Sequence, residues 1–389
     1  MTRVLDSVVV VGGCVAGVSA ADTLRTEGFE GAITVVGDEP HTAYSRPALS
    51  KGVLRGEQDS VSVRLPRLDS SVEVRTSTRA VALDTDRRIV TVEHDGRREA
   101  VAFGGLVIAT GVRARRLAAV ERPDEFVVRD LDHSVALAAA LRGASSVVIV
   151  GGGFLALELA SSIRGMGLAV TVVHTLPPLS RHLGAELACL VVDTARAVGV
   201  RFVATSPGAR ALEGDACGVR LPNGAVVTSD VLVSAIGDQP NVEWLAGSGL
   251  SCNGPLEVTA DGIVRPGIVA AGDVTSTRTA SGSVERTPHW HSAIVQGRVA
   301  ARALLGLAAP ATPTPYFWTE CFGMDIKVTG RIPRWVEPTA LEGSLQQREA
   351  VLQWRGPDGV PVAAATVNRR MPLVKLSRLA RPEFTEVTR

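Results

Sequence analysis

Two groups of small residues in this chain have the spacing of a turn that binds a dinucleotide. In the first, the apolar run Val8–Val11 leads into Gly12, Cys14 and Gly17. The second follows a similar run and consists of Gly151, Gly153 and Ala156. In the fingerprint G-x-G-x-x-G/A, the first glycine makes a tight turn and the second lets the backbone approach a pyrophosphate, while the third lets a helix pack closely on a strand. Two matches in one chain are rarer by chance than one, so the sequence predicts two nucleotide-binding units.

The residue that follows the second strand of each unit should contact the ribose of the nucleotide. Asp38 and Glu39 follow the expected strand Ala32–Val36, about twenty residues after the first fingerprint, where a carboxylate holds the ribose hydroxyls. An exposed acidic turn is the alternative. In the second unit His174 takes this place, and Arg181 would either meet a 2′-phosphate or cap a surface turn. The choice between NADH and NADPH therefore stays open.

Three further strand patterns stop abruptly at small residues, which would let a ligand lie against the backbone. They end at Ala109-Thr110-Gly111, at Gly237 and at Gly272-Asp273. Asp273 would accept a hydrogen bond from a polyol such as the ribityl chain of a flavin, or would cap the next helix. Two cations, Arg46 and Lys51, lie in a proline-containing loop just beyond the second strand, which favours a ligand role over simple solvent exposure.

Composition and charge exclude several classes of protein. The 389 residues, 46% of them hydrophobic and 21% charged, indicate a globular chain of two or three domains. A net charge of +1 gives no electrostatic basis for binding nucleic acid or an anionic membrane. No apolar run reaches the roughly 18 residues of a membrane span, and the five cysteines contain no C-x-x-C pair that would indicate a zinc site. We expect a soluble, cytoplasmic protein without a metal ion.

Strand and helix patterns alternate along most of the chain, which predicts the α/β class with two Rossmann-like units. Residues 72–92 alternate apolar and polar side chains and are expected to form hairpin strands. A helix is expected to follow His289, and residues from Tyr316 onward alternate short strands with turns. That last segment predicts a third, smaller domain.

The motifs taken together resemble those of one family. They are V-V-G-G-C-V-A-G, V-V-G-D-E, Y-S-R-P-A-L-S-K, I-A-T-G, V-V-I-V-G-G-G-F-L-A-L-E, A-I-G-D-Q-P-N, A-A-G-D and P-Y-F-W-T-E, in this order. This series is similar to that of the FAD-containing NAD(P)H:ferredoxin reductases that serve aromatic-ring dioxygenases and bacterial cytochromes P450. The resemblance implies a glutathione-reductase-like fold. In it, residues 1–105 and 226–308 form a split FAD domain, residues 106–225 an NAD(P) domain and residues 309–389 a C-terminal α/β domain.

The resemblance also implies roles for individual residues. Lys51, Glu158 and Trp318 would form the catalytic region, with Glu158 beside the nicotinamide and Lys51, and Trp318 beside the flavin. Trp290 would line the other edge of the flavin. The full set expected to bind the cofactors is Gly12, Cys14, Val15, Ala16, Gly17, Asp38, Glu39, Arg46, Lys51, Ala80, Ala109, Thr110, Gly111, Arg129, Gly151, Gly153, Phe154, Leu155, Glu158, His174, Arg181, Gly237, Gly272, Asp273, Trp290 and Trp318.

The chemistry implied by the resemblance needs no protein nucleophile. NAD(P)H would give a hydride to FAD, and the flavin would pass single electrons to a ferredoxin that feeds a cytochrome P450 or an oxygenase. Related peroxidases and coenzyme A disulfide reductases of the same fold carry a redox cysteine near position 44. His41–Ser45 contains no cysteine, so thiol chemistry at the flavin is not expected. Two alternatives remain: an oxidase or biosynthetic flavoenzyme of the same fold that reduces oxygen or a small molecule, and a flavin-binding, redox-responsive interaction protein with little turnover. We expect a monomer or a homodimer.

Several residues depart from the family pattern. Cys14 replaces the glycine nearest the pyrophosphate, His174 replaces an acid, and Pro288 and the pair Glu320-Cys321 stand where other residues are usual. We predict that the first turn tolerates Cys14 with a small shift, because cysteine is compact and packs like a small apolar residue.

Overall fold

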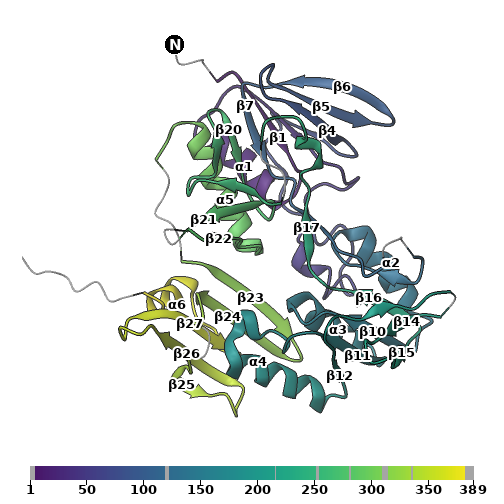
Figure 1. Cartoon of the computed structure of the whole chain (residues 1–389). Coiled ribbons are helices and arrows are strands. Elements are labelled where there is room, and N and C mark those ends of the chain that lie inside the picture. Colours follow the sequence, from purple (N-terminus) through teal and green to yellow (C-terminus); the bar gives the residue numbers. More distant parts are fainter. Residues whose placement is uncertain are drawn as a thin grey trace, which may run out of the picture. The chain divides into compact units, whose positions relative to one another are not determined.

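The structure, a computed structural model, describes residues 5–118, 122–214, 216–250, 254–279, 282–308, 314–333 and 336–381 (Figure 1). The chain divides into two compact units. The first unit contains residues 1–45, 60–113 and 238–313. The second unit contains residues 46–59, 114–237 and 314–389.

A six-stranded sheet forms the centre of the first unit, in the order β19-β20-β7-β1-β2-β3. Its strands are β1 (Ser7–Val11), β2 (Ala32–Val36), β3 (Val72–Arg75), β7 (Gly105–Ile108), β19 (Ile263–Arg265) and β20 (Ile268–Ala270). Neighbouring strands are parallel except β19 and β20. Valine dominates β1, and because β-branched side chains pack well on a pleated surface, this apolar run is stable as a central strand buried on both faces.

Each face of this sheet has its own hydrophobic core. Helices α1 (Val15–Thr26) and α5 (Trp290–Leu304) cover one face, where alanines of both helices pack with Val8, Val10 and Val107 (Figure 1). The antiparallel strands β4 (Arg79–Asp84), β5 (Ile89–His94) and β6 (Arg97–Ala102) cover the other face. The smaller elements are η2 (Glu243–Leu245), β18 (Leu256–Val258), β21 (Thr275–Arg278), β22 (Val284–Glu285), and the paired strands β8 (Val112–Ala114) and β17 (Asp238–Pro240).

The second unit contains a five-stranded parallel sheet in the order β12-β11-β10-β16-β9. The strands are β9 (Glu125–Phe126), β10 (Ser146–Val150), β11 (Ala169–His174), β12 (Arg201–Ala204) and β16 (Val231–Ser234). A small antiparallel sheet of β13 (Arg210–Ala211), β14 (Gly218–Arg220) and β15 (Val226–Thr228) packs on one face. The helices are α2 (Leu131–Leu141), α3 (Phe154–Gly165) and α4 (Ser180–Ala197), and Arg46–Ala48 form the short helix η1.

The C-terminal part of the second unit is a five-stranded antiparallel sheet in the order β23-β24-β27-β26-β25. It comprises β23 (Tyr316–Cys321), β24 (Met324–Gly330), β25 (Thr339–Ser344), β26 (Glu349–Arg355) and β27 (Pro361–Val367). Helix α6 (Leu373–Leu379) packs on it through Leu376.

The α/β class and the two parallel sheets confirm the fold expected from the sequence. One local prediction was wrong: Val72–Arg75 is not a hairpin strand but pairs parallel with β2, and within residues 72–92 only β4 and β5 pair with each other in antiparallel orientation. Alternation shows that a strand has one buried face, but it does not identify the neighbouring strand.

The chain passes between the two units at several points. Strand β7 lies in the sheet of β1 and β16 lies in the sheet of β10, and two of the crossings follow Arg113 and Gly237. Residues 46–59 and the C-terminal sheet both cluster with the second unit. A buried strand ending in small residues has the same sequence pattern in either sheet, so the pattern does not assign it to one of them.

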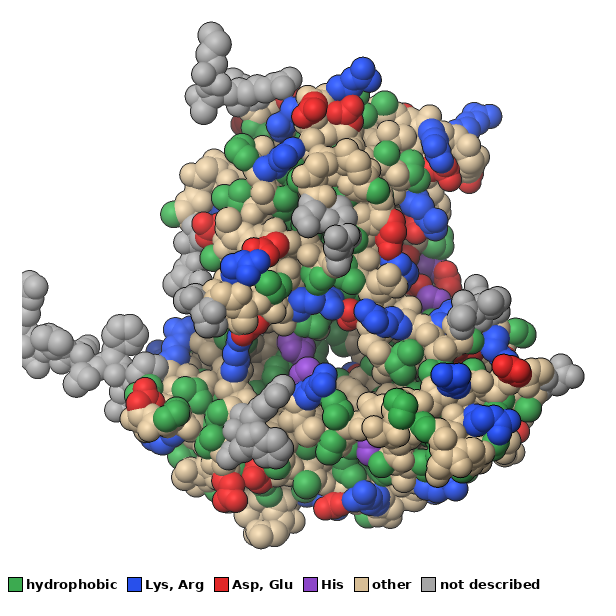
Figure 2. Space-filling model, viewed as in Figure 1, with side chains coloured by type: hydrophobic (Ala, Val, Ile, Leu, Met, Phe, Trp, Pro, Cys, Tyr) green, Lys and Arg blue, Asp and Glu red, His purple; other side chains and the backbone are tan. Residues whose placement is uncertain are grey.

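Charged side chains of both signs are interspersed over the visible face of the molecule (Figure 2). This distribution agrees with the near-neutral net charge of +1. In the described part of the chain, no helix combines the length and the apolar character that crossing a bilayer requires.

Candidate functional site

The two fingerprint turns have nearly the same backbone geometry. Gly12 follows β1 with φ +123°, and Gly151 follows β10 with φ +135°. A Cβ on either residue would lie well inside 3.0 Å of a backbone carbonyl oxygen, that of Ala109 in the first turn and that of Ala235 in the second. Only glycine fits such a position, because both the conformation and the space exclude a side chain. The sequence fingerprints therefore correspond to two equivalent turns.

The residue in the middle of each fingerprint begins the following helix. Cys14 is the N-cap of α1 with φ −101° and ψ −170°, and Gly153 is the N-cap of α3 with φ −86° and ψ −177°. Neither N-cap makes a side-chain capping hydrogen bond, so the backbone N–H groups at both helix starts can serve an anionic ligand. The negative φ of Cys14 is ordinary for an L-residue, so the cysteine causes no backbone strain at this turn.

The acidic residues after β2 are each bound to another side chain. Asp38 Oδ1 lies 3.1 Å from Arg79 Nε, with both side chains mostly exposed. The carboxylate of Glu39 accepts a hydrogen bond from the hydroxyl of Tyr44, and its backbone oxygen accepts one from Ser77 N at 3.0 Å. Ala80 lies in β4, next to Arg79. These contacts keep both carboxylates at the carboxyl end of β2, where the fingerprint places a ribose.

The other predicted residues of the first unit lie at the ends of β7 and β20. Thr110 Oγ1 donates to Asn241 O at 2.8 Å, and Asn241 Nδ2 donates to Thr110 O at 3.0 Å. Gly272 N donates to Gln296 Oε1 at 2.7 Å, and Asp273 O accepts a hydrogen bond from Arg286. Parallel strands bring these ends to the same edge as the first fingerprint turn. Trp290 and Cys14 pack against the same hydrophobic core beneath that turn.

The second unit brings Lys51 and Glu158 together. Lys51 Nζ lies 2.7 Å from Glu158 Oε2, with side-chain exposures of only 14% and 11%. Glu158 is in the second turn of α3, directly after the second fingerprint, whereas Lys51 comes from the loop after η1. Lys51 Nζ also donates to Pro47 O at 3.2 Å. An ion pair this deeply buried needs additional hydrogen bonds to offset its loss of hydration.

Two hydroxyl groups supply those hydrogen bonds. Ser50 Oγ donates to Glu158 Oε2 at 2.7 Å, and Thr319 Oγ1 donates to Glu158 Oε1 at 2.8 Å. The thiol of Cys321 lies nearby in β23, and burial followed by the negative charge of Glu158 raises its pKa to about 12. This thiol is therefore protonated at neutral pH and is not a nucleophile.

Sequence reasoning missed Ser50 and Thr319. Ser50 lies inside the Y-S-R-P-A-L-S-K motif and Thr319 follows Trp318, so both are neighbours of predicted residues. Their residue types alone gave no signal, because serine and threonine hydroxyls are common and bond mostly to backbone. Trp318 itself stacks on Tyr316, with ring centroids 6.0 Å apart.

The remaining predicted residues of the second unit lie at three places. Arg46 donates a hydrogen bond to the backbone oxygen of Arg129, which joins these two predicted residues. Phe154 begins α3, and its ring lies 5.2 Å from that of Phe317. Leu155 follows Phe154 in the first turn of α3, and Gly237 follows β16.

His174 ends β11, and its ring Nδ1 is 3.0 Å from Leu176 O. Burial lowers the pKa of His174, the hydrogen bond to Leu176 O partly opposes this, and the charge of Arg196 lowers the pKa further, so the imidazole is mostly uncharged at neutral pH. Arg181 is exposed in the first turn of α4. The histidine therefore brings no charge to the position where a ribose is expected.

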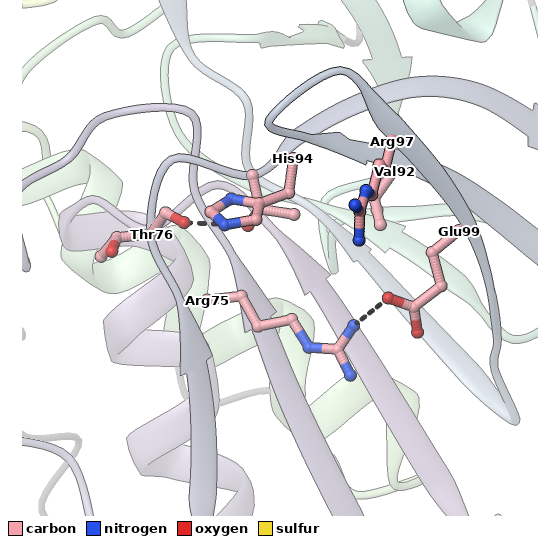
Figure 3. Close-up of a pocket in the computed structure, with 7 residues that line it drawn as sticks. Arg75, Thr76, Val92, His94, Arg97 and Glu99 are labelled. Atoms are coloured by element: carbon pink, nitrogen blue, oxygen red, sulfur yellow. Dashed lines mark hydrogen bonds and ion pairs between the residues drawn. The ribbon is translucent and has the colours of Figure 1, made fainter.

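A separate pocket of about 450 Å³ lies in the first unit (Figure 3). It is lined by Arg75, Thr76, Thr78, Val92, His94, Arg97 and Glu99, none of which was predicted to bind a cofactor. Arg75 is neutralised by Glu99 at 3.1 Å and by Glu73 at 2.9 Å, and His94 Nδ1 is 2.9 Å from Ser77 O. Because these groups already satisfy one another, the pocket is not assigned to the functional site.

A family model described as "Pyridine nucleotide-disulphide oxidoreductase" matches residues 6–297. The chain belongs to this family. The match spans both fingerprint turns, the Lys51–Glu158 pair and the strand ends described above. The two glycine turns fit a family named for a pyridine nucleotide, because each leaves next to the backbone a space that a Cβ would fill.

Relatives match this oxidoreductase over most of its length. The biphenyl dioxygenase system ferredoxin–NAD(+) reductase component of Paraburkholderia xenovorans strain LB400 is 31% identical over 96% of this chain and 93% of its own. Rhodocoxin reductase of Rhodococcus erythropolis is 30% identical over 83% of this chain and 78% of its own. Among solved structures, the ferredoxin reductase for the CYP199A2 system of Rhodopseudomonas palustris has a TM-score of 0.85 at 30% identity, covering 94% and 91%. Putidaredoxin reductase in its covalent complex with putidaredoxin has a TM-score of 0.86 at 25% identity, and the match covers 97% of this chain and 93% of that one.

Proposed function

We propose that this oxidoreductase takes electrons from NAD(P)H onto FAD and passes them singly to a ferredoxin that feeds a cytochrome P450 or another oxygenase. The observation that carries the proposal is the pair of equivalent glycine turns, at Gly12 and Gly151, in a chain whose full-length relatives include named ferredoxin–NAD(+) reductases. One glycine turn lies in each unit, so a single chain would offer two dinucleotide sites. We infer that it works in the cytoplasm, where reduced nicotinamide nucleotides are available.

The first unit would hold FAD. The pyrophosphate would lie at the start of α1, the ribose would meet the acidic residues after β2, and the strand end at Asp273 would bind the polyol chain. When bound, the flavin supplies chemistry that side chains lack, because it accepts two electrons from a nicotinamide and returns them one at a time.

The second unit would hold the nicotinamide nucleotide on the turn before α3. Glu158 lies one helical turn beyond that turn and holds the ammonium of Lys51 at 2.7 Å. The pair, neutral overall, would present a fixed and oriented ammonium–carboxylate dipole to the nicotinamide, and its burial limits the access of water. Cys321 stays protonated, with its pKa raised to about 12, so the chain's own thiol does not take part in disulfide chemistry there.

We further propose that the enzyme discriminates weakly between NADH and NADPH. A carboxylate at the end of β11 would hydrogen-bond the 2′-hydroxyl of NADH and repel the 2′-phosphate of NADPH. His174 is uncharged at neutral pH and does neither, while Arg181 is available to a phosphate from the first turn of α4. We expect the two nucleotides to differ by less than about tenfold in kcat/KM, which corresponds to about 1.4 kcal/mol.

The decisive experiment is an anaerobic titration of the FAD-loaded protein with NADH and with NADPH. The flavin absorbance should bleach, and catalytic turnover should depend on added ferredoxin, read as cytochrome c reduction. No bleaching with either nucleotide would overturn the proposal. Equal turnover with and without ferredoxin, accompanied by peroxide, would identify an oxidase instead.

A further inference from the structure

The strand that carries Trp318 lies along one face of helix α3. Three contacts join the helix to the strand and to the residue that follows it: the rings of Phe317 and Phe154 are 5.2 Å apart, Thr319 Oγ1 donates to Glu158 Oε1 at 2.8 Å, and Phe322 N, just after the strand, donates to Ser161 Oγ at 2.7 Å. The helix positions 154, 158 and 161 are spaced by four and three residues, which places them on one face. The contacts at helix positions 154 and 161 are a pair of aromatic rings and a hydrogen bond from a backbone N–H to a serine hydroxyl. The contact between them, at Glu158, reaches the carboxylate of the ion pair.

Thr319 is well suited to hold that carboxylate. It is 1% exposed, so water does not compete for its hydroxyl. Ser50 and Lys51 both donate to Oε2, so among the described residues Thr319 is the donor at Oε1. A carboxylate held at one oxygen can rotate about its terminal torsion, which is broad in glutamate, but one held at both oxygens cannot. Thr319 therefore fixes the plane of the carboxylate.

We propose that Thr319 is a positioning residue through which the C-terminal sheet sets the Lys51–Glu158 pair for reaction with the nicotinamide. The inference rests on the proposed function of the same site. Fixing the carboxylate plane fixes the direction from which Lys51 is held, and small misplacements of a group at a reacting centre are costly in rate. The hydroxyl acts through Glu158, because its donated hydrogen bond goes to that carboxylate.

The test compares Thr319→Val, which keeps the shape and removes the hydroxyl, with Thr319→Ser, which keeps the hydroxyl. Thr366→Val is the matched control, because Thr366 is fully buried in the same sheet and its hydroxyl has no hydrogen-bond partner among the described residues. Rate constants of flavin reduction by saturating nucleotide are measured by anaerobic stopped flow. Nucleotide affinity is measured separately, from the perturbation of the flavin spectrum by the oxidised nucleotide.

Thr319→Val should lower the reduction rate constant tenfold or more while nucleotide affinity changes less than twofold. Thr319→Ser should restore most of the lost rate, and Thr366→Val should leave it unchanged. A Thr319→Val rate within twofold of wild type, or a loss confined to affinity, would overturn the inference. If the wild-type flavin is not reduced by either nucleotide, the proposed function fails instead, and the two failures are distinct.

A double-mutant cycle separates positioning from general packing. In the Glu158→Ala background the hydroxyl has no carboxylate to hold, so adding Thr319→Val should change the rate less than twofold. A further tenfold loss in that background would show that Thr319 does not act through Glu158. Should Thr319→Val fail to fold, Thr319→Ala, which also removes the donor to Oε1, serves in the same cycle with the same expected coupling.

Discussion

The ammonium of Lys51 lies 2.7 Å from Oε2 of Glu158, and both side chains are largely buried. These residues are more than one hundred positions apart in the chain, yet they form one charge-neutral group with two hydroxyl donors. Buried pairs of this kind are costly to break, because removing one partner leaves the other charge without compensation.

Glu158→Ala should therefore reduce the free energy of unfolding by about 3 kcal/mol or more. The double variant Lys51→Met with Glu158→Leu should recover most of that loss, since it removes both charges. Urea unfolding curves at equal FAD saturation measure the difference. Asp193→Ala, which breaks the exposed pair with Arg196, is the control and should leave the midpoint unchanged. A Glu158→Ala midpoint equal to that of wild type would contradict this prediction.

Gly17→Ala should damage the first turn severely. A Cβ there would lie well inside 3.0 Å of the carbonyl oxygen of Gly12, which is backbone and cannot move aside easily. We expect a loss of about 2 to 3 kcal/mol and a colourless, FAD-free protein. Gly165→Ala, at the end of α3 where a Cβ meets open space, is the matched control and should stabilise by about 0.5 to 1 kcal/mol. Both are read from thermal unfolding and from the flavin absorbance of the purified protein.

Cys14→Gly should change FAD affinity by less than about tenfold, or 1.4 kcal/mol. Cys14 already has the backbone conformation of Gly153 in the second turn, and its φ of −101° suits any L-residue. Titration of apoprotein with FAD, followed by flavin fluorescence, measures the two dissociation constants. A gain in affinity above tenfold would mean that the sulfur pushes the pyrophosphate away.

His174→Glu should convert the enzyme to a preference for NADH. The new carboxylate would repel a 2′-phosphate, so kcat/KM for NADPH should fall at least tenfold while that for NADH stays within threefold. His174→Gln removes the imidazole without adding charge and should affect both nucleotides equally. Steady-state kinetics with a constant ferredoxin concentration distinguish these outcomes, and equal losses in His174→Glu would place the ribose elsewhere.

The raised pKa of Cys321 makes stability depend on pH in the alkaline range. The thiol ionises near its ordinary value of 9.0 when unfolded but near 12 when folded, so the unfolded state loses its proton first. Stability from this group is complete below pH 9 and is lost as the pH rises toward 12. Cys321→Ala should unfold with a shallower pH dependence than wild type between pH 9 and 11. If urea unfolding gives the same change of unfolding free energy with pH for both proteins, Cys321 is not buried in the folded protein.

The sequence by itself determined the parts of the molecule that local physics dictates. The runs Val8–Val11 and 147–150 fold as central strands because valine favours a buried pleated strand, and the glycines after them mark turns that no other residue can make. These features predicted the α/β class, the two glycine turns and the acidic residues at the end of β2. They act over a few residues, so they are visible in a single sequence.

Only the tertiary structure decided which distant residues meet. The strand Val72–Arg75 joined the central sheet rather than a hairpin, and β7 and β16 proved to belong to different sheets, because strand pairing depends on partners far along the chain. The hydroxyl of Thr319 reaches Glu158 across more than one hundred and fifty residues of sequence. Hydroxyl groups carry no periodic pattern of their own, and their role appears only when folding removes water from around them and leaves a carboxylate as their partner.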